Sequence, residues 1–247
     1  MIDNLLLSTT RVTTFSNDLL LTNATGFFFA REERLFLVTS RHVMIDSNAN
    51  HAPNRLEIEI HNNSENLAES IQFSIPLYYK NSPNWLELND SDGKTDIAVI
   101  EIFREALPEK TILTAFTPNH LPSNDAYIEV GSRLLIVVFP LGFQDTLHHS
   151  AVVRQAGLAS AFGLRFQGQG FFLTDARTHR GSSGAPVVMR LQDEDGKNVK
   201  GEMPYLLLGI HSSRFDVKTR DLAVDEALGL NCAWYTTDIL MTLTEKS

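Results

Sequence analysis

Only one cysteine, Cys232, stands among the 247 residues, so an intramolecular disulfide is excluded. The absence of a disulfide framework fits a reducing compartment. Cys232 lies in a mostly apolar run, residues 230–234, where we expect it to be buried. No stretch approaches the roughly 18 apolar residues of a membrane-spanning helix, and residues 1–7 lack the basic segment of a secretory signal. We therefore expect a cytoplasmic protein that has no membrane partner.

Positive charge is also scarce. Lys and Arg together number 21 against 30 for Asp and Glu, which gives a formal net charge of −9. A surface that binds nucleic acid needs clustered Lys and Arg, so nucleic acid is not an expected partner. The acidic excess mainly favours solubility. With 43% hydrophobic residues, the chain is long enough for one large β domain or two small ones that share a cleft.

Helical periodicity is nearly absent, and short strand-like runs dominate. Residues 26–30 and 35–39 are apolar and flank a charged turn, which predicts a hairpin. Residues 55–61 alternate between polar and apolar side chains, as in a strand with one wet face. The Pro-rich residues 107–124 are predicted to link two halves, and residues 236–245 to form a short terminal helix. Many short strands separated by turns favour barrels or sandwiches.

Three short segments carry residues suited to nucleophilic catalysis. They are Leu-Val-Thr-Ser-Arg-His-Val at 37–43, Lys-Thr-Asp-Ile-Ala-Val-Ile at 94–100 and Arg-Gly-Ser-Ser-Gly-Ala-Pro-Val-Val at 180–188. A serine hydroxyl is a weak nucleophile until a neutral imidazole takes its proton and a carboxylate orients that imidazole. The segments therefore indicate Ser183 as the nucleophile, His42 as the base and Asp96 as the orienting carboxylate.

The turn around Ser183 also suits the charge that its attack would create. A carbonyl under attack becomes an oxyanion, which needs two converging N–H donors. The Gly-Ser-Ser-Gly-Ala-Pro turn predicts these donors at the backbone of Gly181 and Ser183. Gly181 permits a turn conformation that a side chain would resist, and Gly184 permits close packing behind the nucleophile.

In the order His, Asp, Ser, these segments resemble the chymotrypsin/trypsin-like serine peptidase family. Residues 139–143 and 153–157 are similar to the compact trypsin-like peptidases of bacteria. The resemblance implies an all-β fold of two six-stranded antiparallel β-barrels with a short C-terminal helix. Residues 1–115 would form the N-terminal barrel with His42 and Asp96, and residues 116–247 the C-terminal barrel with Ser183. Together they would make one endopeptidase domain that works through an acyl-enzyme.

Each motif has a plainer interpretation when it is taken alone. A Ser-Gly pair is usually a turn, an Asp before a strand is usually a cap, and a His after a strand is usually packed or exposed. Ser182 competes with Ser183 as nucleophile, but the family pattern selects the second serine after Gly181. Asp92 competes with Asp96, but it stands in a polar turn.

Ser182 also bears on activation. Zymogen-activated relatives carry an aspartate just before the nucleophile, and that aspartate pairs with a newly cut N-terminus. Ser182 occupies this position here, so no such ion pair can form. We therefore predict no activation by N-terminal cleavage.

Substrate preference is predicted from two segments that would wall the specificity pocket. Arg177 stands six residues before Ser183, where trypsin-type enzymes carry an aspartate, so a preference for Lys or Arg is not expected. Thr178 and His211 resemble the pocket residues of glutamyl endopeptidases and of glutamine-cutting viral relatives. Both can donate a hydrogen bond to a side-chain carbonyl or carboxylate, which predicts Glu or Gln at the P1 residue, whose carbonyl is cut. The alternative is that His211 only packs beneath the cleft.

The remaining expectations concern partners and other function classes. Ser212, Ser213 and Arg214 are predicted to pair with the backbone of a polypeptide substrate as an added strand. His148 and His149 are adjacent and diverge on a strand, and no His-x-x-x-His helix exists, so we expect no metal and no cofactor. A regulatory partner is conceivable but unidentified. The main competing function is a proteolytically silent peptide-binding module, and a small-ester hydrolase is disfavoured because its Gly-x-Ser-x-Gly elbow is missing.

Overall fold

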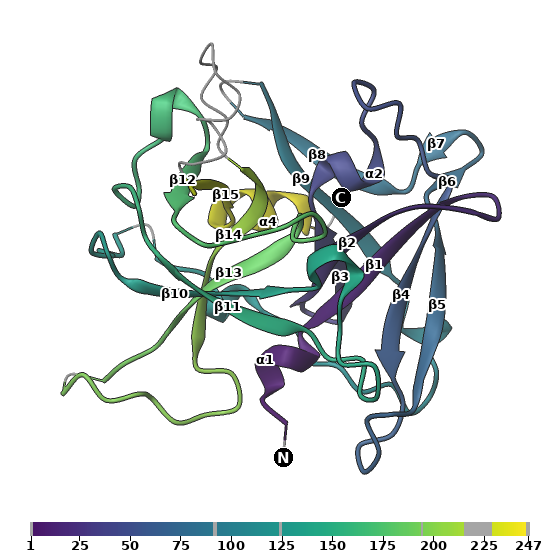
Figure 1. Cartoon of the computed structure of the whole chain (residues 1–247), viewed down its shortest axis with the longest axis horizontal. Helices are drawn as coiled ribbons and strands as arrows, with labels where there is room; N and C mark the ends of the chain where they lie inside the picture. The colour runs from purple at the N-terminus through teal and green to yellow at the C-terminus, as the bar shows by residue number, and fades with distance from the viewer. Residues whose placement is uncertain (1, 91–92, 124, 194, 215–228, 246–247) are drawn as a thin grey trace.

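The computed structural model describes residues 2–90, 93–123, 125–193, 195–214 and 229–245. Most of the structure is antiparallel β-sheet, and the strands form two curled sheets that lie side by side (Figure 1). The all-β double-barrel fold predicted from the sequence is confirmed. No helix of the described residues is long and apolar enough to cross a lipid bilayer.

The first sheet is built from strands that all precede residue 103. These are β1 (Thr9–Ser16), β2 (Leu19–Arg31), β3 (Arg34–Thr39), β4 (Arg55–His61), β5 (Ser70–Pro76), β8 (Trp85–Asp90) and β9 (Gly93–Ile102). Their order in the sheet is β5-β4-β1-β2-β3-β9-β8, so β5 and β8 are the two outermost strands. A small hairpin, β6 (Tyr78–Tyr79) and β7 (Ser82–Pro83), separates them. The first sheet thus has seven strands where six were expected.

The second sheet holds the six strands that were expected. These are β10 (Arg133–Val138), β11 (Val152–Gly157), β12 (Phe171–Thr174), β13 (Ala185–Arg190), β14 (Tyr205–Arg214) and β15 (Asn231–Tyr235). Their order is β11-β10-β13-β14-β15-β12. A bridge between Leu158 and Thr174 joins the two outer strands and closes the ring.

The helical segments among the described residues are all short. They are α1 (Asn4–Leu7), α2 (Arg41–Met44) and α4 (Thr237–Leu243), with the 3₁₀ turns η1 (Arg104–Ala106), η2 (Pro118–His120), η3 (Pro140–Gly142) and η4 (Phe166–Gly168). The predicted terminal helix is α4. His42 lies within α2, directly after β3, rather than at the end of a strand.

Three apolar clusters explain why these strands assemble. One fills the first barrel and includes Leu56 and Ile58, the inward residues of the alternating strand β4. A second fills the other barrel, and a third lies between the two barrels and contains Phe29, Phe116 and Trp234. Because apolar burial is the main favourable term in folding, the shared cluster holds the barrels against each other. The space between their rims is where a functional site can form.

The segment predicted to link the two halves runs along the first barrel rather than free of it. Phe116 is fully buried, and its N–H and C=O bond to Phe28 and Ala30 of β2. Asn124, at the end of the predicted linker, lies outside the described residues. The division into residues 1–115 and 116–247 stays a prediction.

Candidate active site

His42 and Asp96 meet where α2 packs against β9. The His42 Nδ1 lies 2.7 Å from Asp96 Oδ2, and the His42 backbone N–H donates to Asp96 Oδ1 at 2.9 Å. Both carboxylate oxygens are therefore bonded to the same histidine, which fixes the ring and leaves Nε2 for other partners. The Ser212 hydroxyl also donates to Asp96 Oδ2. Asp92, the competing carboxylate, lies outside the described residues.

A charged network holds α2 on the neighbouring hairpin. Glu87 of β8 lies 2.8 Å from both Arg41 Nε and Lys94 Nζ. Burial raises the pKa of Glu87, but the hydrogen bonds and charges of Lys94 and Arg41 lower it more, so the carboxylate stays ionised. Because Arg41 precedes His42 in the same short helix, this network ties the histidine to the strands that carry Asp96.

Two opposed effects set the pKa of His42. Burial lowers it, whereas the hydrogen bond to Asp96 and the charge of that carboxylate raise it more, so the net pKa lies above 6.5. Asp46 adds to the rise and Arg41 opposes it. A carboxylate on Nδ1 stabilises the imidazolium, which is the state that a general base reaches after taking a proton.

Ser183 and His42 line the same cavity, which has a volume of about 420 Å³. The Ser183 hydroxyl donates to the backbone carbonyl of Ser212 at 2.9 Å. Within the described residues, Ser183 and His42 share no hydrogen bond in this resting arrangement. Catalytic hydrogen bonds are often formed only when substrate is bound, and a hydroxyl reaches a new partner by rotating about χ1.

The carbonyl groups of residues 180–183, in the turn that carries Ser183, are each engaged by a donor. Arg180 O accepts from Leu141 N–H, Gly181 O from the Thr25 hydroxyl, Ser182 O from Ala185 N–H and Ser183 O from Thr25 N–H. The N–H groups of Ser182 and Gly184 donate to His179 O and His211 O. Among the described residues, the N–H groups of Gly181 and Ser183 have no acceptor. These are the two donors predicted for an oxyanion.

Both glycines of the turn are required by geometry. Gly181 has φ +91°, and a β-carbon there would lie 2.6 Å from Phe139 O. Gly184 has φ +85°, and a β-carbon there would collide with Thr25 O and the Thr39 hydroxyl. Side chains rarely adopt these φ values, so the turn depends on glycine at both positions.

The two residues predicted to read the P1 side chain lie in the same cavity. Thr178 and His211 are buried, and both line it beside Ser183. The Thr178 hydroxyl donates to Asn231 Oδ1 at 2.6 Å, and Asn231 Nδ2 donates to Ala176 O at 2.6 Å. The Thr178 proton therefore points to Asn231, and it would have to turn to meet a ligand.

His211 is held neutral. Burial, followed by the charge of His42, lowers its pKa to about 4. Its Nδ1 is buried with no hydrogen-bond partner among the described residues. A neutral imidazole can still form a hydrogen bond with a polar ligand, but it carries no negative charge that would balance a cation.

The residues predicted to bind a substrate strand lie at the end of β14. Pairing between β14 and β13 stops at His211, opposite Ala185, so Ser212 and Ser213 continue past their neighbour. Ser212 and Ser213 line the cavity. Arg214 ends the strand opposite Asn231, and the described part of the structure does not include its side chain.

Ser182, the alternative nucleophile, points elsewhere. It is 1% exposed, and its hydroxyl has no partner among the described residues. The cavity beside His42 is lined by Ser183 and not by Ser182. Arg177, at the position that is acidic in trypsin-type enzymes, is exposed.

Three residues with contacts at the site were not singled out from the sequence. They are Thr25, Leu141 and Asn231, and each reaches the site from a segment distant along the chain. One signal was present for Asn231, a polar residue at the start of an apolar run. Leu141 lies in residues 139–143, which carried part of the family resemblance, whereas nothing in the local sequence of Thr25 distinguishes it.

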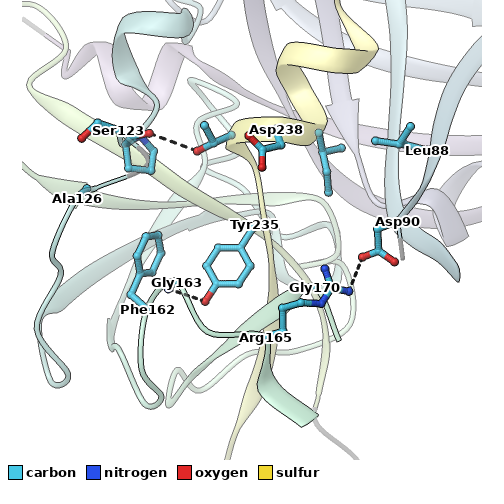
Figure 2. A pocket seen from close by; sticks show the side chains of 13 residues that line it. Leu88, Asp90, Ser123, Ala126, Phe162, Gly163, Arg165, Gly170, Tyr235 and Asp238 are labelled. Atoms are coloured by element: carbon cyan, nitrogen blue, oxygen red, sulfur yellow. Dashed lines mark hydrogen bonds and ion pairs between the residues drawn. The ribbon is translucent and has the colours of Figure 1, made fainter. Parts of the chain in front are cut away.

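A second cavity, of about 340 Å³, shares no lining residue with the first (Figure 2). The rings of Phe162 and Tyr235 form one wall, and Arg165 reaches across to Asp90 at 2.8 Å. The Tyr235 hydroxyl accepts from Gly163 N–H. In the described ranges, no cluster of three or more His, Cys, Asp or Glu side chains has the arrangement of metal ligands.

Comparison with known proteins bears on the fold and the family. No curated protein matches the sequence. A solved structure, the serine endoprotease from Yersinia pestis, aligns with 96% of this chain at 17% identity and a TM-score of 0.55. The alignment spans 63% of that chain. At 17% identity, the match supports the fold alone. The family model described as trypsin-like peptidase domain matches residues 24–197. The chain belongs to the trypsin-like peptidase family.

Proposed function

We propose that this protein is a serine endopeptidase in which Ser183 is the nucleophile, His42 the general base and Asp96 the carboxylate that orients the base. The observation that carries the proposal is the convergence of His42 and Ser183 on one cavity, with both Asp96 oxygens bonded to His42. This arrangement satisfies the chemical needs of an activated serine.

The reaction begins with rotation of the Ser183 hydroxyl from Ser212 O toward His42 Nε2. The imidazole takes the proton as Ser183 Oγ bonds to the scissile carbonyl carbon, and the carbonyl oxygen becomes negative. The imidazolium then gives the proton to the leaving amine, which leaves an acyl-enzyme. Water, deprotonated by His42, attacks the ester and releases the acid and the serine.

The oxyanion is proposed to bind the N–H groups of Gly181 and Ser183. The support is that the carbonyls of residues 180–183 are each engaged by another donor, while these two N–H groups have no acceptor among the described residues. Such fixed donors strengthen as charge develops, and losing one costs about 3 kcal/mol of transition-state stabilisation.

We further propose that the substrate pairs with Ser212, Ser213 and Arg214 and places Glu or Gln at P1 beside Thr178 and His211. The support is that the pairing of β14 with β13 stops at His211, and that both side chains line the cavity. A peptide series varied only at P1 tests this preference. Faster cleavage after Gln or Glu than after Lys or Phe is expected, and the reverse ranking overturns it.

Labelling with a fluorophosphonate tests the nucleophile. Wild type and Ser182→Ala should react, and Ser183→Ala should not, because only Ser183 lines the cavity beside His42. Ser182→Ala is the matched control, since it removes the neighbouring hydroxyl. A wild-type protein that binds peptide but resists the probe would indicate the silent peptide-binding module instead.

A further inference from the structure

Thr25 joins the first barrel to the nucleophile turn of the second. It lies in β2 and is fully buried. Its hydroxyl donates to Gly181 O at 2.8 Å, and its backbone N–H donates to Ser183 O at 2.9 Å. Two carbonyls of the turn are therefore held by a single residue from the other barrel.

The direction of the Thr25 proton follows from its neighbours. Phe139 N–H, 3.0 Å from the hydroxyl oxygen, can only donate, so the oxygen accepts this bond. The Gly181 carbonyl can only accept, so the single hydroxyl proton points to it. The hydroxyl thus joins Phe139 to the nucleophile turn, since it accepts from Phe139 N–H and donates to Gly181 O.

The segment that starts at Phe139 reaches the turn a second time. Leu141 N–H donates to Arg180 O at 2.6 Å. Because the C=O and N–H of a trans peptide point in opposite directions, this bond turns the Gly181 N–H away from Leu141. Leu141 itself has φ +56°, an uncommon conformation that the surrounding contacts must hold.

Gly181 depends on these contacts because it has no β-carbon. Its φ is +91°, in a region that glycine adopts readily because it has no side chain. Steric clashes at Gly181 therefore do little to prevent rotation of the peptide groups on either side. The peptide before it is held by Leu141 and the peptide after it by the Thr25 hydroxyl. Removing one bond releases one side of the glycine.

We propose that Thr25 is a positioning residue for the oxyanion hole, an inference that rests on the proposed serine peptidase function. Its hydroxyl holds the peptide after Gly181. The Gly181 N–H belongs to the peptide before it, so Thr25 acts across the Gly181 α-carbon, by limiting the rotations of the glycine that would move this N–H away from the cleft. Without the hydroxyl, the turn samples conformations in which this N–H no longer points at the oxyanion and cannot donate to it. Thr25 does not line the cavity, so its influence on the reaction passes through the turn.

The test replaces Thr25 by valine, which keeps the shape and removes the hydroxyl. We expect kcat of Thr25→Val to fall about 100-fold with KM within about twofold, because the oxyanion exists in the transition state and not in bound substrate. Inhibition by a peptide aldehyde, whose adduct carries the same oxygen, should weaken by a similar factor. Thr25→Ser, which keeps the hydroxyl, should recover most of kcat.

Thr10→Val is the matched control. Thr10 is a buried threonine of the same sheet, and its hydroxyl likewise bridges an N–H and a carbonyl, both of Glu59. It should lose thermal stability as Thr25→Val does and keep wild-type kcat. Equal losses of kcat in the two valine variants would overturn the positioning role, as would unchanged kcat in Thr25→Val.

Two further outcomes are separable. If Thr25→Val does not fold, Thr25→Ala is measured in the same way, and wild-type kcat in that variant contradicts the proposal. If wild type itself neither cleaves peptides nor reacts with a fluorophosphonate, the proposed function fails. In that case aldehyde binding that is identical in wild type and Thr25→Val also contradicts the Thr25 inference.

Discussion

Ser182 and Ser183 are adjacent in sequence but differ in environment. The hydroxyl of Ser182 is buried and has no partner in the described part of the chain, whereas that of Ser183 faces the cavity and bonds to Ser212 O. A buried hydroxyl with no partner has lost its water without compensation. A serine hydroxyl therefore lowers the stability of the fold at position 182 and has a proposed chemical role at position 183.

The first prediction concerns stability at Ser182. Replacing it with alanine removes the uncompensated hydroxyl, so the free energy of unfolding should stay equal or rise by about 1 kcal/mol. Ser8→Ala is the comparison, because the buried Ser8 hydroxyl donates to Leu5 O at 2.7 Å. It should lose about 1 kcal/mol. Urea unfolding measures both, and a larger loss for Ser182→Ala would contradict the assignment.

The second prediction concerns the pH dependence of activity. His42 must be neutral to accept a proton, and its pKa is raised, chiefly by Asp96 against the effect of burial. Activity should therefore appear as pH rises through a midpoint above 6.5, the ordinary pKa of histidine. Asp96→Asn should shift the midpoint of kcat/KM downward and lower kcat by about 10⁴-fold, as for the triad on which that figure is based. An unshifted midpoint in Asp96→Asn would exclude this pairing as the cause.

At the scale of elements, the walls of the cavity are held by contacts between distant segments. Asn231, at the start of β15, ties residues 176 and 178, just before the nucleophile turn, to the second barrel. Asn231 is 2% exposed, so water cannot replace these bonds. The position of Thr178 thus depends on a strand that follows it by about fifty residues.

The third prediction tests that dependence. Asn231→Ala leaves the buried Ala176 carbonyl without its amide donor and should lower the free energy of unfolding by about 1–3 kcal/mol. KM for a preferred peptide should rise more than kcat falls, because the change disturbs the proposed P1 wall and not the triad. Asn66→Ala, at an exposed loop position, should change neither quantity. Steady-state kinetics and urea unfolding measure the two effects.

Elements with local signals were predictable from the sequence. The hairpin of β2 and β3, the alternating β4 and the terminal helix α4 each follow from side chains within a few residues. The seventh strand of the first sheet was not predictable, because the connection between β5 and β8 depends on distant contacts. Leu77 N–H donates to Asn54 O, and Asn84 N–H donates to Leu77 O. The same reason applies to the site. Its three main side chains stand in recognisable segments, whereas Thr25 is identified by a contact across the barrels and Leu141 by a contact within the second half.

At the scale of the whole molecule, buried and half-buried histidines link stability to pH. Burial lowers the pKa of His211 to about 4, and burial also lowers the pKa of His61 and His120. These groups bind protons more readily in the unfolded chain. The pKa of His42 is raised, so its contribution is fully present below 6.5 and is lost as pH rises through the raised value.

The fourth prediction follows for His211. Its stabilising contribution is fully present above pH 6.5 and is lost as pH falls toward 4, by up to about 3 kcal/mol. The free energy of unfolding should therefore decrease across this range, and less steeply in His211→Gln. Urea unfolding at several pH values measures the slope. Parallel slopes for the two proteins would contradict a neutral, buried His211.

The cluster of apolar side chains shared by the barrels has a consequence beyond folding. The proposed base belongs to one barrel and the proposed nucleophile to the other, and the cluster that includes Phe29, Phe116 and Trp234 joins them. Any ligand or modification that loosens this seam separates the alcohol from its imidazole without touching either. The rate at which Ser183 reacts with a covalent probe should therefore report how closely the two barrels pack against each other.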